Sequence, residues 1–313
     1  NDASTLTTEE KSGTDGTVKW KLNDKSELYI SGSGNMKDYS TLTNAHYPPW
    51  HSFYQYEENG FSRSGMTLSA KKIYIADIEH IGRSAFTNSL QLTYVSIPNT
   101  VKSIGSGAFS SCPLLKSITI PNSVISIQGG TFAGSGISVI KIPNSVTYVG
   151  ARTFYNSALD SISLSHSIEQ IGTETFALCE NLKSIVIPNS VKDINSEAFY
   201  GCINLTKVSM GPVKYIRKGA CRGGSGVTSI TIPSSVIWLE KEIFKDCTNL
   251  KSVVLNCSTS LPTNAFENCG LESIVIPSSI SMISDYAFRG CKNLKSITME
   301  SSHPPKIGYG VFN

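Results

Sequence analysis

Eight cysteines and five histidines are the residues of this 313-residue chain whose chemistry could support metal binding, disulfide bonding or catalysis. Six of the cysteines stand three residues after a recurring phenylalanine: Cys112, Cys179, Cys202, Cys247, Cys269 and Cys291. Other copies of the same pattern place a small residue there instead: Ser89, Ser135, Ser157 and Gly224. The position therefore requires a small side chain, and we expect buried free thiols that pack as small apolar groups. Equivalent side chains of stacked copies point the same way rather than at each other, which disfavours disulfides.

The same residues offer little support for a metal site or for catalysis. Cys247, Cys269 and Cys291 supply three sulfurs without the C-x-x-C spacing that is typical of zinc sites. His46 and His51 are five residues apart in a segment without a helical pattern, which only weakly favours a metal pair. The chain contains no Gly-x-Ser-x-Gly, no His-Glu-x-x-His and no phosphate-binding motif. We predict no catalytic residue, no metal site and no cofactor.

The segments that must position these residues repeat every 21 to 24 residues between Ile73 and Phe312. One unit reads I-P-N-T-V-x-x-I from residue 97 and F-x-x-C-x-x-L-x-x-I-x-I from residue 109. Regular aliphatic positions at a period of about 20 to 29 residues are typical of a leucine-rich-repeat solenoid. Cys221 replaces the phenylalanine of the seventh coil, where we expect looser packing. The phenylalanines are Phe86, Phe109, Phe132, Phe154, Phe176, Phe199, Phe244, Phe266, Phe288 and Phe312.

The predicted fold class is a β-rich, right-handed leucine-rich-repeat solenoid of ten to eleven coils over residues 71–313. Ile185 and Ile187 alternate with polar residues, which predicts a short strand in each coil. The stretch around Ala198-Phe199 predicts a single turn of α- or 3₁₀-helix. Stacked coils should lie about 4.8 Å apart, the spacing of paired strands.

The first seventy residues depart from the repeat, and we expect residues 16–70 to form a β cap over the open end of the core. Residues 1–15 lack periodicity and are expected to be flexible. Residues 18–22 and 27–31 predict the two strands of a hairpin. The aromatic cluster that includes Trp50, Tyr54 and Tyr56 has two interpretations: it covers the first coil, or it is a stacking platform for a glycan.

Composition excludes some classes of partner. The net charge is +3 and charged residues make up 16%, which is too weakly basic to favour a nucleic-acid surface. Serine, threonine, asparagine and glycine make the predicted surface neutral and hydroxyl-rich. No apolar run reaches about 18 residues, so we expect no transmembrane segment. The chain begins at Asn1 without methionine, as a mature or trimmed product would.

Three outward positions of each predicted strand should align into columns when the coils stack. Most are short polar residues, and these have an ordinary structural interpretation because they keep a sheet soluble. The alternative is a concave binding face for a protein or a glycan. The residues that we assign to such a face are Tyr94, Lys116, Thr119, Lys141, Lys183 and Lys207.

These motifs resemble the BspA-like branch of leucine-rich-repeat proteins, also described as the Treponema pallidum type. The resemblance rests on the unit Ile-Pro-Asn-Ser-Val-x-x-Ile with Ala-Phe-x-x-Cys-x-x-Leu and on the lead-in residues Trp20, 28–39 and Pro49-Trp50. It covers roughly residues 17–313. It implies a secreted or surface-attached bacterial protein, without shared catalytic residues, whose relatives adhere to host matrix proteins, host cells or other bacteria.

The residues and the resemblance together predict an extracellular, non-enzymatic binding or adhesion protein. It is expected to be a monomer that recognises proteins or glycans on host or bacterial surfaces through a broad solenoid face. Two alternatives stay open: a glycan-binding accessory protein that uses the N-terminal aromatic cluster, and a structural spacer.

Overall fold

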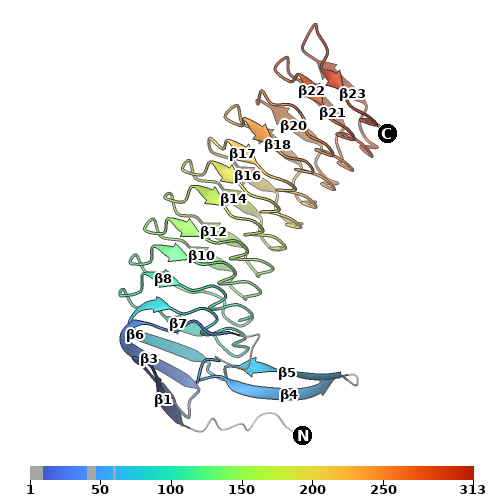
Figure 1. Ribbon diagram of the computed structural model, residues 1–313. Helices are drawn as coiled ribbons and strands as arrows, with labels where there is room; N and C mark the ends of the chain where they lie inside the picture. The colour runs from blue at the N-terminus through green and yellow to red at the C-terminus, as the bar shows by residue number, and fades with distance from the viewer. Residues whose placement is uncertain (1–9, 41–46, 59–60) are drawn as a thin grey trace.

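Short aliphatic-rich strands recur in every repeat, and their stacking produces an elongated, gently curved solenoid (Figure 1). The computed structural model describes residues 10–40, 47–58 and 61–313, and for residues 53–58 and 61–66 it describes the backbone only. Every regular element within these ranges is a strand, so none of them is a helix able to cross a membrane. The cap strands lie at one end of the solenoid and the C-terminus at the other (Figure 1).

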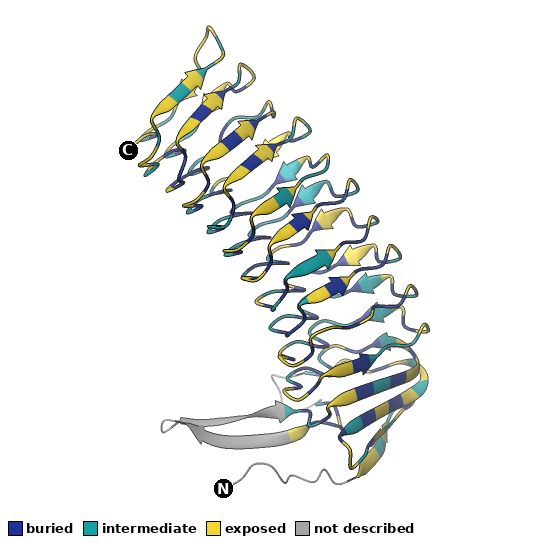
Figure 2. Ribbon diagram, turned by 180° about the vertical axis from the view of Figure 1, so that it is seen from behind, coloured by how far each residue is buried: buried dark blue, intermediate teal, exposed yellow. Residues whose placement is uncertain are grey.

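The sequence predicts the first strand of each coil, and the structure has it in every coil except the one that contains residues 115–120. In β14, Ile185 is buried between the exposed Ser184 and Val186, and Figure 2 shows the same banding along the solenoid. β14 pairs in parallel with the next coil, with Ser184 opposite Lys207, so the predicted columns are confirmed. We call the outer surface of these strands the first-strand face. Its strands are β7 (Tyr94–Ser96), β10 (Val139–Lys141), β12 (Ser161–Ser163), β14 (Ser184–Val186), β16 (Lys207–Ser209), β18 (Ser229–Ile232), β20 (Ser252–Leu255), β21 (Ser273–Ile276) and β23 (Ser296–Met299).

A second strand of two residues lies on another side of most coils. The sequence pattern marks its buried aliphatic residue, such as Ile194, but does not predict the strand itself. We call the outer surface of these strands the second-strand face. Its strands are β8 (Ser103–Ile104), β9 (Ser126–Ile127), β11 (Tyr148–Val149), β13 (Gln170–Ile171), β15 (Asp193–Ile194), β17 (Tyr215–Ile216), β19 (Trp238–Leu239), β22 (Met282–Ile283) and β24 (Lys306–Ile307).

The segment around each phenylalanine is a succession of tight turns rather than the predicted helical turn. Residues two before and two after the phenylalanine have positive φ, as Glu197 (56°) and Gly201 (67°) do. Left-handed residues at this spacing prevent a right-handed helix from forming. The N–H groups of these turns donate instead to carbonyl oxygens of the next coil. One such set runs from Glu197, Phe199 and Gly201 to Lys218, Ala220 and Arg222, at 2.9, 2.7 and 3.0 Å.

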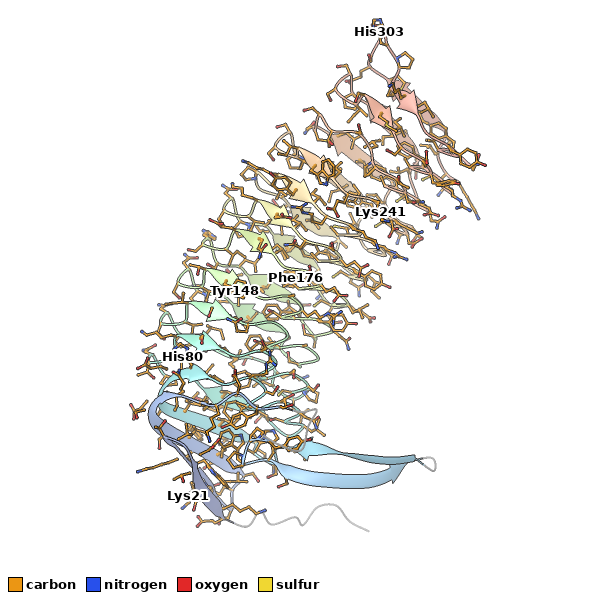
Figure 3. All side chains as sticks on the ribbon, viewed as in Figure 1. Lys21, His80, Tyr148, Phe176, Lys241 and His303 are labelled. Atoms are coloured by element: carbon orange, nitrogen blue, oxygen red, sulfur yellow. The ribbon has the colours of Figure 1, made fainter. Side chains whose placement is uncertain are left out.

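Each junction between neighbouring coils makes this set of three bonds, from residues 84–88 through to 309–313. We call the continuous series the turn ladder. The buried phenylalanine rings stack beneath it, and Phe176 is labelled in Figure 3. The rings of Phe154 and Phe176 are 5.6 Å apart and 2° from parallel. Cys221 is buried in the seventh coil, where its N–H keeps the turn ladder with a 3.0 Å bond to Ile243. The core is therefore a column of rings that is interrupted once.

The cap extends the sheet of the first coils through β1 (Lys11–Asp15), β2 (Val18–Leu22), β3 (Glu27–Asn35) and β6 (Lys72–Ile81). The predicted hairpin is confirmed, since β2 pairs antiparallel with β3. Lys11–Asp15 form a strand that pairs with β2, whereas residues 1–9 lie outside the described residues. The flexibility of residues 1–15 stays a prediction. A second hairpin, β4 (Ser52–Glu58) and β5 (Phe61–Thr67), projects sideways from the cap (Figure 1).

Candidate ligand-binding faces

The cysteine column contributes to stability and packing. All eight cysteines are free; seven are buried and Cys291 is half-buried. Cys179 Sγ donates a hydrogen bond to the carbonyl oxygen of Phe154 in the preceding coil, at 3.0 Å. Burial raises the pKa of the Cys112 thiol to about 12 and that of Cys179 to about 11. The prediction of buried free thiols is confirmed, and thiols that resist ionisation are poor nucleophiles.

Trp50 is part of the core at its N-terminal end. Its side chain is 2% exposed, and its Nε1 donates to the carbonyl oxygen of Ala85 at 2.8 Å. The indole packs against Tyr39, with ring centroids 5.5 Å apart, and against Phe86 at 5.9 Å. A sugar cannot stack on a buried indole, so the glycan-platform hypothesis is wrong for Trp50. The apolar end of the phenylalanine column needs a cover, and Trp50 provides it.

The structure describes only some of the other members of the N-terminal cluster. Tyr54 and Tyr56 lie on β4, and their side chains are outside the described residues, as is His46. His51 is buried with Nε2 3.0 Å from the carbonyl oxygen of Thr87, and burial lowers the pKa of His51 to about 4. Over the described ranges, no group of three or more His, Cys, Asp or Glu could hold a metal ion.

Lys116 and Lys183, two of the predicted site residues, line one groove on the first-strand face. The groove has a volume of ≈ 540 Å³ and also contains Val139 and Asp160. Lys183 Nζ is 2.5 Å from Asp160 Oδ1 on the neighbouring coil, and Lys116 Nζ donates to the carbonyl oxygen of Pro113 at 3.2 Å. The ion pair is exposed and therefore costs little to open for a ligand. We call this the lysine groove.

The remaining predicted residues are exposed along the same face but do not line the lysine groove. Lys141 lies on β10 and Lys207 on β16, and Thr119 lies in the equivalent segment of a coil that has no assigned first strand. Tyr94 is the last of three stacked tyrosines that the sequence analysis does not predict to be neighbours. The ring centroids of Tyr29 and Tyr74 are 5.0 Å apart, and those of Tyr74 and Tyr94 are 5.7 Å apart. Because these rings cover one another, the tyrosine column stabilises the sheet at the cap.

Exposed valines give the first-strand face an apolar component. Val186 is 68% exposed although it occupies a strand position that faces solvent. Outward positions of a soluble sheet usually carry polar residues, so these valines add apolar contact surface that a partner could cover. The exposed valines of this face are Val139, Val186, Val254 and Val275.

The second-strand face carries two further grooves that the sequence analysis misses. The Tyr148 groove, of ≈ 640 Å³, is lined by Tyr148, Gln170, Asp193 and Tyr215 among others. The Trp238 groove, of ≈ 610 Å³, is lined by Trp238, Glu240, Thr259 and Ser260 among others. The sequence does contain an indication of both grooves. Tyr148 and Trp238 directly precede the buried aliphatic residue of β11 and β19, whereas serine precedes it in β8 and β9.

The carboxylates beside these grooves are neutralised by Arg217. Its guanidinium binds both carboxylate oxygens of Asp193, with Nη2 2.7 Å from Oδ2 and Nε 3.1 Å from Oδ1. Its Nη1 is 3.4 Å from Glu240, and its Cζ lies 4.9 Å above the centre of the Tyr215 ring. A bidentate pair of this kind fixes both partners. The second-strand face is therefore polar but close to electroneutral at its centre.

Comparison with known proteins places these features in a family. A family model described as BspA type Leucine rich repeat region matches residues 79–206 and 214–313, in 6 copies. A leucine-rich repeat protein from Bacteroides ovatus ATCC 8483 is 23% identical, with 97% of this chain and 90% of that chain covered and a TM-score of 0.61. One from Eubacterium ventriosum ATCC 27560 is 23% identical over 96% of this chain and 93% of that chain, with a TM-score of 0.58.

No curated protein matches the chain. At this level of identity, the two solved structures support the fold alone. The family model extends over most of the solenoid. The chain belongs to the BspA-type leucine-rich-repeat family.

Proposed function

We propose that this protein is an extracellular, non-enzymatic binding protein that attaches to a macromolecule of a host or bacterial surface through its first-strand face. The observation that carries the proposal is the pairing of exposed valines with lysines on one side of the solenoid. Val139 lies between Lys116 and Lys183 in the lysine groove, so apolar contact and charge are available together. Interfaces combine these two components in their centre and rim.

The arrangement of the face suits attachment better than chemistry. Outward residues repeat at each coil, so a partner with an extended surface can make many modest contacts at once. Linked contacts of this kind raise the overall avidity without any single strong site. The family relationship supports a binding scaffold, and the partner class that we propose is a protein or a glycan displayed on a host or bacterial surface.

The lysines provide the test. Charge reversal of Lys116, Lys141 and Lys207 to glutamate should weaken binding of the purified protein to immobilised matrix proteins or whole bacterial cells. The matched control reverses Lys25, Lys102 and Lys292, which are exposed lysines away from this face, so the net charge change is the same. Weaker binding in the first variant alone supports the proposal. Equal binding by both variants contradicts it, provided that circular dichroism shows both to be folded.

A further inference from the structure

The hydrogen-bond ladder of the second-strand face is broken at two junctions, whereas the turn ladder is unbroken. At an intact junction, Lys192 donates to Glu169 at 2.8 Å and Asn195 donates to Ile171 at 2.9 Å. No backbone bond joins residues 147–150 to residues 169–172, all of which the structure describes. β11 and β13 consequently belong to separate sheets. The loop before β13 is instead held by Asn144, whose Oδ1 accepts the N–H of His166 at 2.9 Å.

The second break has a covalent cause. The residue after the buried aliphatic normally donates to the preceding coil, as Glu240 does to Ile216 at 2.9 Å. In the next coil this residue is Pro262, which has no N–H. Leu261 makes a bridge only to Ile283 on the following coil. The Tyr148 groove lies at the first break and the Trp238 groove at the second, so each groove is the gap left by missing ladder bonds.

Each break has an exposed aromatic ring at its edge. Tyr148 is 44% exposed and Trp238 is 54% exposed, and no other aromatic ring of the described residues packs on either one. This differs from the tyrosine column on the first-strand face, where the rings cover one another. Tyr148 and Lys241, labelled in Figure 3, mark the two grooves. Open aromatic faces beside amide, hydroxyl and carboxylate groups are suited to pyranose rings, which have one apolar C–H face and a polar rim.

The spacing along the face favours a polysaccharide over a peptide. Tyr148, Gln170, Asp193, Tyr215 and Trp238 occupy the same outward position in five consecutive coils. Coils that stack about 4.8 Å apart place Tyr148 and Trp238 about 19 Å from each other. An extended pyranose chain advances by about one coil spacing per sugar. An extended peptide advances about 3.3 Å per residue and would lose register within a few coils.

The charge of the face indicates an uncharged ligand. Arg217 neutralises Asp193 and contacts Glu240, while Glu169 is accompanied by Lys192 in the lining of the Tyr148 groove. Lys218 and Lys241 line the Trp238 groove beside Glu240, so cations and carboxylates are mixed along the face. Neither an acidic polysaccharide nor a basic peptide would therefore meet a surface of uniformly opposite charge. Neutral hydroxyl groups can bond to Gln170, Thr259 and Ser260 without displacing an ion pair.

We propose that the second-strand face from β11 to β19, with the adjoining residues Thr259 and Ser260 of the next coil, binds an unbranched, uncharged polysaccharide that runs along the solenoid axis. Tyr148 and Trp238 are the two stacking positions. Gln170 between them and Thr259 and Ser260 beyond Trp238 bond to sugar hydroxyls. The proposal uses a different face from the lysine groove and does not depend on it.

Affinity electrophoresis in gels that contain mixed-linkage β-glucan, xylan, mannan or pullulan tests the proposal. Retardation of the wild-type protein by at least one of them is expected, and the Tyr148→Ala/Trp238→Ala double variant should bind about tenfold more weakly per ring lost. Tyr94→Ala, an exposed ring on the other face, is the matched control and should be retarded like the wild type. Calorimetry with oligosaccharides should show affinity that rises until the chain reaches about five sugars, one for each coil of about 4.8 Å.

Two results overturn the proposal: absence of retardation in all four gels, or equal retardation of the double variant and the wild type. Thermal unfolding must show that the double variant is folded; both rings are exposed, so a large loss of stability is not expected. The Lys116/Lys141/Lys207 variant serves on the same gels as a second control. Its normal retardation, together with lost binding to matrix proteins or cells, would separate the two faces experimentally.

Discussion

The indole of Trp50 lies over the ring of Phe86, with centroids 5.9 Å apart and 27° between the planes. The same column of rings continues from Phe86 to Phe109, with centroids 5.4 Å apart. Trp50 therefore occupies the position in the stack that the phenylalanine of a preceding coil would have. The Trp20 ring packs edge-on against Trp50, with ring centroids 6.4 Å apart. The cap thus ends the core by continuing its stacking and then covering the last ring.

Substitution of Trp50 by alanine should reduce the free energy of unfolding by about 3–5 kcal/mol, the usual range for loss of a large buried aromatic side chain. Urea denaturation measures this change. Trp238→Ala is the matched control, because Trp238 is exposed and its removal should cost about 0.5 kcal/mol or less. A cost for Trp50→Ala as small as that of the control would contradict the capping role.

The repeated part of the fold was predictable because each coil states the same pattern again. The positions of Ile185 and Ile187 carry apolar residues in all ten copies of the repeat, with one residue between them. This alternation predicts that both side chains point into the core. The cap has no copy against which to set its phase, so the aromatic cluster around Trp50 could be interpreted as core or as surface. Burial of apolar area decides between them, and only the three-dimensional position of Phe86 shows that the end of the core is there to be covered.

Two local features escaped prediction for a different reason. The segment around Phe199 has the length of a helical turn, but its hydrogen bonds go to the next coil, which a local pattern does not contain. The ladder breaks at β11 and β19 also depend on neighbouring coils. The cause of the second break can be read from the sequence, because Pro262 stands at a position whose N–H normally donates to the preceding coil, and proline has no N–H.

The buried thiols should make stability depend on pH in alkaline solution. Burial raises the pKa of Cys112 from 9.0 to about 12, so its stabilising contribution is complete below pH 9 and is lost as the pH rises toward 12. The reason is that the unfolded thiol ionises first and stabilises the unfolded state, by about 1.4 kcal/mol per pH unit for each such thiol. Urea midpoints at pH 8 and pH 10 measure the effect.

Cys112→Ser is the control for the alkaline effect, because Ser89 and Ser135 occupy the same position in the adjacent coils. Its stability should fall less between pH 8 and pH 10 than that of the wild type. An identical fall in both proteins would show that Cys112 does not ionise differently in the two states.

The seventh coil should be a local weak point in the solenoid. Cys221 leaves a gap in the ring column between Phe199 and Phe244, although its backbone bond to Ile243 is intact. Because a cysteine side chain is smaller than the phenylalanine that it replaces, we expect the Cys221 amide to exchange with solvent faster than the Phe176 amide, which donates to Ala198 at 2.9 Å. Native-state hydrogen exchange measures both, and equal protection would refute the expectation.

The central claim is that successive coils stack in register, so that outward residues form the columns on which both proposed binding faces depend. Spin labels at Ser184 and Ser273 are separated by four coil junctions, and labels at Ser117 and Ser296 by eight, all at outward positions of the same column. Pulsed electron–electron double resonance should give a distance of about 19 Å for the first pair and about 38 Å for the second. Two similar distances, or a longer one for the first pair, would contradict the stacking.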